Sequence, residues 1–140
     1  MSKGINTTEM VIGNMKRKLL YILFPVLYVI GALGDNVFTY YYVRVLGIFS
    51  EANPFRAHQV YTQPLWMWFI RDLLMLAIAI ALTFLYKKLM ERDTRTLRLA
   101  DRAWVILAVV AVTRFIPVVH NLLVLFGVRS PLADIYKVFH

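Results

Sequence analysis

Three long apolar segments are the feature of this sequence that most limits its possible folds. They cover about residues 19–46, 64–86 and 103–128. Each is long enough to cross a bilayer, because a hydrocarbon core of roughly 30 Å takes about 20 helical residues. Backbone N–H and C=O groups find no water in lipid, so isolated segments of this kind cross as helices. The sequence therefore predicts an all-α fold, a polytopic membrane bundle of three transmembrane helices.

Composition weighs against the competing interpretation, a soluble bundle with long apolar core helices. Hydrophobic residues make up 60% of the 140 residues and charged residues only 17%, whereas an average soluble chain carries roughly 25% charged residues. Three apolar segments fill about half of this short chain, which leaves too little polar material to cover a small soluble domain. Residues 1–140 are expected to form a single integral membrane domain.

The distribution of Lys and Arg predicts the orientation of the helices. Ten of these residues lie before the first segment or between the second and third, against four on the opposite side. By the positive-inside rule, the amino terminus is cytoplasmic and the carboxyl terminus is outside, as expected for a multi-pass protein of the cell membrane. The net charge of +8 is then mainly an orientation signal. The expected partner is the lipid bilayer rather than nucleic acid.

The connecting segments carry signals for short interfacial helices. Gly47 is a helix stop, and Asn53-Pro54 has the form of a cap followed by a first-turn proline, so residues 54–61 are predicted to form a helix in the outer loop. A further helix is expected to begin before the first span. Residues 131–140 have the apolar spacing of an amphipathic tail helix on the outer surface.

Several polar residues interrupt the apolar segments, and an estimate of depth from the helical rise places them together in the outer half of the membrane. Because a charged group at this depth costs roughly 2.5 to 3.5 kcal/mol, such residues should face one another or water. We expect Asp35 and Asp72 to neutralise two arginines in a buried ionic network completed by hydrogen bonds. The candidate network consists of Asp35, Asn36, Thr39, Arg71, Asp72, Arg114, His120 and Asn121, with Arg71 and Arg114 as the arginines.

Three interpretations of this network stay open. It could fix helix register or an oligomer interface, line a substrate or ion path, or form a catalytic centre. The chain has no cysteine and no HExxH or GxSxG motif, so neither a catalytic group nor a cofactor can be named from the sequence. Weak candidates for metal ligands on the outer side are His58, His120 and Glu51.

A short set of motifs resembles a known group of proteins. Asp35-x-x-x-Thr39 is followed by an aromatic stretch, by Gly47 and by Glu51-x-Asn53-Pro54. This pattern resembles small uncharacterised prokaryotic integral membrane proteins with a D-x-x-x-T first helix and an E-x-N-P loop. The resemblance implies three or four membrane helices and no known reaction. It also implies that the basic residue and the asparagine that later helices often supply correspond here to Arg71 and Asn121.

Three functions are compatible with these observations. The first is a non-catalytic membrane protein, a homo-oligomer or a subunit or assembly factor of a larger membrane complex, because three helices enclose little interior. The second is a small transporter or channel unit with an outward-facing polar path. The third is an intramembrane enzyme or a metal site on the outer side.

Overall fold

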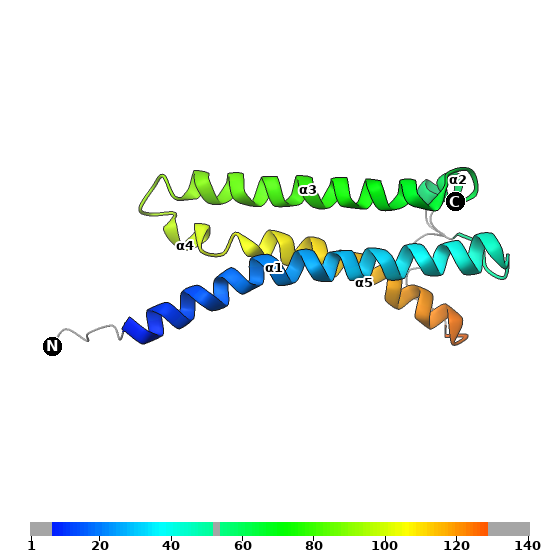
Figure 1. Ribbon diagram of the computed structural model, residues 1–140, viewed down its shortest axis with the longest axis horizontal. Coiled ribbons are helices and arrows are strands. Elements are labelled where there is room, and N and C mark those ends of the chain that lie inside the picture. The colour runs from blue at the N-terminus through cyan, green and yellow to red at the C-terminus, as the bar shows by residue number, and fades with distance from the viewer. Residues whose placement is uncertain (1–6, 52–53, 129–140) are drawn as a thin grey trace.

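The computed structural model describes residues 7–51 and 54–128, and every regular element in this part of the chain is a helix. The prediction of an all-α bundle with three membrane-spanning helices is confirmed (Figure 1). In chain order the elements are α1 (Thr7–Phe38), the π-helix η1 (Thr39–Val45), α2 (Pro54–Thr62), α3 (Leu65–Met90), α4 (Leu97–Ala100) and α5 (Trp104–Leu125).

Three helical segments are long and apolar enough to cross a membrane, and the chain is a multi-pass membrane protein. They are Met15–Val45, Leu65–Met90 and Leu97–Leu125, close to the segments predicted from the sequence. The predicted helix in the outer loop is present as α2, which lies at one end of the bundle, while α4 lies at the other (Figure 1). The predicted tail helix, residues 131–140, falls outside the described residues.

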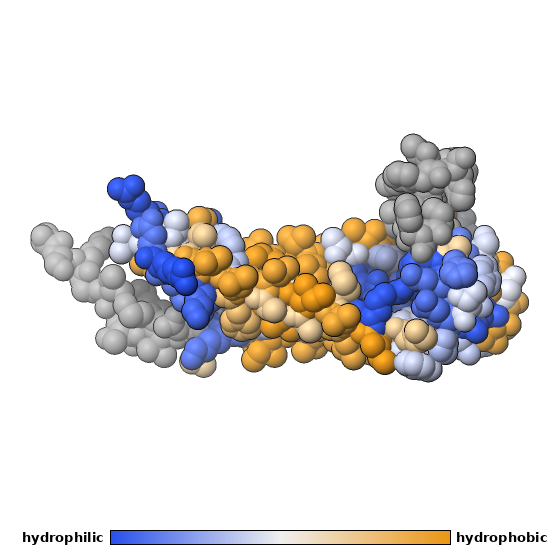
Figure 2. Space-filling view, turned by 90° about the horizontal axis from the view of Figure 1, so that it is seen from above, coloured by the Kyte–Doolittle hydropathy of each residue, from blue (hydrophilic) through white to orange (hydrophobic). Residues whose placement is uncertain are grey.

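The surface between these two ends is apolar. Figure 2 shows a continuous hydrophobic band between two hydrophilic ends. Helix α3 contributes strongly to it, because Ile70, Leu74, Ile78 and Leu85 are all more than 40% exposed. Such a face would be unfavourable in water and is suited to lipid tails or to another apolar helix.

Helix α1 and η1 form one continuous rod that ends at Gly47. In the last turns the backbone widens into the π-helix, where the N–H of Leu46 donates to the carbonyl of Tyr41 at 2.9 Å. Gly47 then has a φ of 62°, a left-handed conformation that costs glycine little and commonly ends a helix. The predicted helix stop is confirmed, and it returns the chain toward α2.

The closest packing in the bundle is between α1 and α5, and glycine makes it possible. A Cβ added to Gly31 would lie 3.3 Å from the backbone oxygen of Arg114, and one on Gly34 would lie 3.5 Å from Val118. Small residues in membrane helices allow this approach of two backbones. The apolar core beside the crossing consists of Tyr28, Ala32, Leu76 and Ala111. The Arg114 side chain thereby starts close to α1.

Replacing Gly31 by leucine should separate α1 from α5. We expect Gly31→Leu to lower the free energy of unfolding by about 1–3 kcal/mol through overpacking. The matched control is Gly13→Leu, because a Cβ at Gly13 meets no atom within 4 Å. Thermal unfolding of both variants in the same mild detergent measures the difference. Equal midpoints for the two variants would contradict this account of the helix crossing.

Candidate functional site

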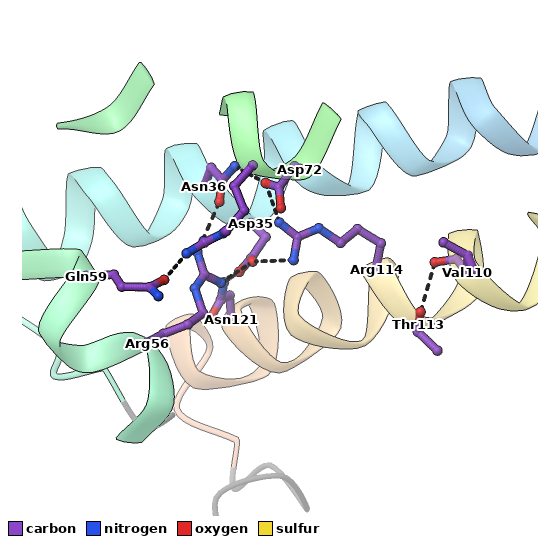
Figure 3. A network of polar contacts seen from close by, with 10 residues as sticks. Asp35, Asn36, Arg56, Gln59, Asp72, Val110, Thr113, Arg114 and Asn121 are labelled. Atoms are coloured by element: carbon purple, nitrogen blue, oxygen red, sulfur yellow. Dashed lines mark hydrogen bonds and ion pairs between the residues drawn. The ribbon is translucent and has the colours of Figure 1, made fainter. Parts of the chain in front are cut away.

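The candidate site is a set of charged and amide side chains near the α2 end of the bundle (Figure 3). Helix α1 supplies Asp35 and Asn36, which are 1% and 0% exposed, and α3 supplies Asp72, which is 6% exposed. Helix α5 supplies Arg114 and Asn121. The structure thus brings together five residues of the predicted network from three different helices.

Asp72 is the point at which the three long helices meet. Its Oδ2 accepts a hydrogen bond from Asn36 Nδ2 of α1 at 2.6 Å and another from Arg114 Nη2 of α5 at 2.5 Å. Arg114 Nη1 lies 3.7 Å from Asp35 Oδ2, so one guanidinium is shared between two carboxylates. Hydrogen bonds to ionised groups are shorter and stronger than neutral ones. This shared arginine ties all three membrane helices together.

Asp35 receives donors from two other elements. Arg56 Nη1 of α2 lies 2.5 Å from Asp35 Oδ2, and Asn121 Nδ2 of α5 donates to Asp35 Oδ1 at 3.1 Å. The other terminal nitrogen of Arg56 donates to Asn36 Oδ1 at 3.0 Å. The planar fork of arginine suits this arrangement, since it contacts two neighbouring side chains of α1 at once.

The prediction that Arg71 neutralises one of the carboxylates is wrong, because Arg56 is the arginine that pairs with Asp35. Arg71 forms no ion pair with Asp35 or Asp72 and instead donates to Gln59 Oε1 of α2. Adjacent residues of a helix point about 100° apart. Since Asp72 is directed at α1 and α5, Arg71 is directed at α2.

A signal for Arg56 was present in the sequence. Gln59 and Val60 follow Arg56 by three and four residues, so the three side chains share one face of α2. That face packs on the bundle: Val60 is buried beside Val43 and Trp68. Arg56 was missed because it was counted as a loop charge outside the membrane.

The network is electrically balanced. Asp35 and Asp72 carry two negative charges, and Arg56 and Arg114 carry two positive charges. Burial alone would lower the pKa of Arg56, but the attraction and hydrogen bond of Asp35 outweigh it and raise the pKa above the ordinary value. Arg56 also lies 5.9 Å from the ring centre of Trp68, and Arg114 lies 5.9 Å from that of Tyr28. Both guanidiniums therefore lie between carboxylates on one side and an aromatic ring on the other.

A cavity of about 130 Å³ adjoins the network between the end of α1, η1, the chain before α2, and α5. It is large enough for several water molecules. Its polar lining includes Asp35, Arg56 and Arg114 together with four other residues: Thr39, Glu51, His120 and Asn121. Thr39 is buried one turn beyond Asp35, so the D-x-x-x-T and E-x-N-P motifs both contribute to the wall of this cavity.

The weak metal candidates are only partly brought together. Glu51 and His120 line the cavity, whereas His58 is exposed on α2. Within residues 7–51 and 54–128, no three His, Asp or Glu side chains are grouped so that they could hold a metal ion. Pro54 is the first residue of α2, and Asn53 lies outside the described residues.

No protein-family model, curated protein or solved structure matches this chain. The arrangement is suited to holding four elements in register, because both carboxylates are engaged by donors from other helices.

Arg56 and Arg71 should contribute unequally to stability. We expect Arg56→Gln to lower the free energy of unfolding by about 3–5 kcal/mol, because it breaks a buried ion pair and leaves excess negative charge. Arg71→Gln removes a hydrogen bond to Gln59 and should cost about 1 kcal/mol. Thermal unfolding in detergent compares the two. A larger loss for Arg71→Gln would mean that Arg71 is the arginine that neutralises the carboxylates.

Proposed function

We propose that this protein is a non-catalytic integral membrane protein that acts as a homo-oligomer or as a subunit or assembly factor of a larger membrane complex. The observation that carries the proposal is the balanced ionic network, in which Asp35 is paired with Arg56 and Asp72 is paired with Arg114. A general base needs a free acceptor at its reacting atom. Carboxylates engaged in this way hold helices together rather than accept protons from a substrate.

The outer face of α3 supports association with another helix. Ala77 and Ala81 are exposed on this face at four-residue spacing, and small residues at that spacing allow two membrane helices to approach closely. Large apolar side chains flank them, including Leu74 and Ile78. We propose that a second copy, or a helix of a larger complex, packs on this face.

Larger side chains at positions 77 and 81 should prevent association through this face of α3. We expect Ala77→Ile combined with Ala81→Ile to reduce the native protein from an oligomer to a monomer, measured as mass in mild detergent. The control is Val109→Ile with Val112→Ile, which enlarges two exposed residues of α5 and should leave the mass unchanged. A native protein that is strictly monomeric, and that brings no other protein with it from native membranes, would contradict the proposal.

The cavity favours a second candidate, a transporter or channel unit with an outward-facing polar path. Charged and polar side chains rarely line a space within a membrane protein unless they pair or contact a transported species. Here Arg56, Arg114 and His120 face a cavity of about 130 Å³ whose wall also includes exposed Ser50. Under this candidate, the cavity is the outer end of the path.

Blocking the cavity tests this second candidate. If the path exists, proteoliposomes should pass Na⁺, Cl⁻ or H⁺ faster than protein-free vesicles, and Ser50→Trp should reduce that flux at least about fivefold by occlusion. Thr62→Trp is the control, because Thr62 is exposed on α2 and lies outside the lining. Flux no greater than that of protein-free vesicles for all three ions would count against transport of these ions.

Two further proposals come from the sequence. We propose that the amino terminus and the loop containing α4 face the cytoplasm of the cell, since ten of the Lys and Arg residues lie on that side.

The similarity to small membrane proteins with D-x-x-x-T and E-x-N-P motifs is likewise a proposal. Its support is that Asp35, Thr39 and Glu51 lie on the wall of one cavity.

A further inference from the structure

A second hollow lies at the end of the molecule opposite α2. This groove, which we call the basic groove, has a volume of about 300 Å³ and runs between the start of the first span and the end of α3. The connection between α4 and α5 closes its third side. It is lined by Arg17, Lys18, Tyr21, Phe84, Lys87 and Asp101.

The basic groove has an excess of positive charge. Arg17 is paired with Asp101 at 2.7 Å, and Lys87 lies 3.8 Å from Glu91, which is outside the lining. Exposed pairs of this kind contribute little and leave the field of the cations only partly cancelled. Residues 16–18 and 87–102 together carry nine Lys and Arg against three Asp and Glu. The groove therefore attracts an anion.

An aromatic pair organises the groove. The ring of Tyr21 stacks on Phe84 with 6.0 Å between ring centres, and the Lys87 ammonium lies 5.5 Å from the centre of the Tyr21 ring. The Lys87 ammonium thus lies close to an aromatic ring while its side chain is still 37% exposed. Tyr21 lies near the start of the span Met15–Val45, and tyrosine is enriched near the ends of spans, at the level of lipid headgroups.

The groove opens directly onto apolar surface. Ile22 and Leu85 are 64% and 54% exposed, and Phe84 itself is 54% exposed. Figure 2 shows the hydrophobic band beginning next to the hydrophilic end at left. An anion free in water would contact only the basic side chains. A lipid would contact the basic side chains with its headgroup and the apolar surface with its acyl chains.

We propose that the basic groove is a binding site for an anionic phospholipid of the phosphatidylglycerol class. Its phosphodiester lies among Arg17, Lys18 and Lys87, and its acyl chains follow the apolar surface beside Phe84. A zwitterionic phospholipid is disfavoured, because its ammonium group would have to lie among these cations. Basic pockets between membrane helices are known to suit anionic headgroups.

Lipid binding to the full-length protein in mild detergent tests this site. Native mass spectrometry with added phosphatidylglycerol should detect a bound lipid, and Lys18→Gln combined with Lys87→Gln should weaken its binding about tenfold or more, since each removed cation contributes on the order of 1 kcal/mol. Lys87→Arg, which keeps the charge, should retain it. The matched control is Lys88→Gln with Arg92→Gln, because it removes the same charge from exposed residues outside the groove.

The possible results distinguish a specific lipid site from a general attraction of anions to a basic surface. Retention by the control variant and loss by the groove variant support the proposal. Equal loss in both variants would mean that only the overall charge matters, and equal retention of phosphatidylcholine would mean that the headgroup is not selected. Displacement of the lipid by millimolar inorganic phosphate would mean that the groove binds a free anion. Any of these three results overturns the lipid site.

Discussion

The bundle depends on placing two carboxylates that are almost fully buried together with two guanidiniums that are mostly buried. Each charge alone would be costly there, and removing one partner leaves the other uncompensated. Arg114 meets this constraint for the membrane helices, because it contacts Asp72 at 2.5 Å and lies 3.7 Å from Asp35. The small residues at the crossing of α1 and α5 help to meet the same requirement. Gly31 allows the backbone at Arg114 to lie close to the helix that carries Asp35.

The short helix α2 completes the charge balance, and the contacts that do so also fix its position. Without Arg56, the two aspartates would face a single cation within the network. Arg56 reaches Asp35 and Asn36 from α2, while Val60 on the same face is buried against Trp68 and Val43. A helix of nine residues is marginal alone. Here the Arg56–Asp35 ion pair, the hydrogen bonds of Arg56 and Gln59, and the packing of Val60 fix it over the end of the bundle. Arg56 also forms part of the cavity wall.

The helical architecture could be predicted from the sequence, because the length and the apolar character of each span depend on local composition. The sequence also identified the aspartates, Arg114 and Asn121, since charged and amide side chains stand out in apolar segments. It did not predict which arginine pairs with Asp35. Arg71 lies within a span and Arg56 in a connection, and membrane depth alone favoured Arg71. The direction of Arg71 depends on how α3 is rotated against its neighbours, which is decided by packing across helices. Only the helical spacing of Arg56, Gln59 and Val60 pointed to the correct partner.

The two ends of the molecule use charge in opposite ways. At the α2 end the buried charges cancel within the protein, so the helices stay together without any external ion. At the α4 end the charges lie on the surface and do not cancel, and Arg17 and Asp101 are each about half exposed. Surface charge of one sign costs little in contact with water and anionic headgroups, whereas the same excess at the network would be unfavourable. The neutral network therefore holds the helices to one another, whereas the basic end is the part of the surface that we propose contacts anionic headgroups.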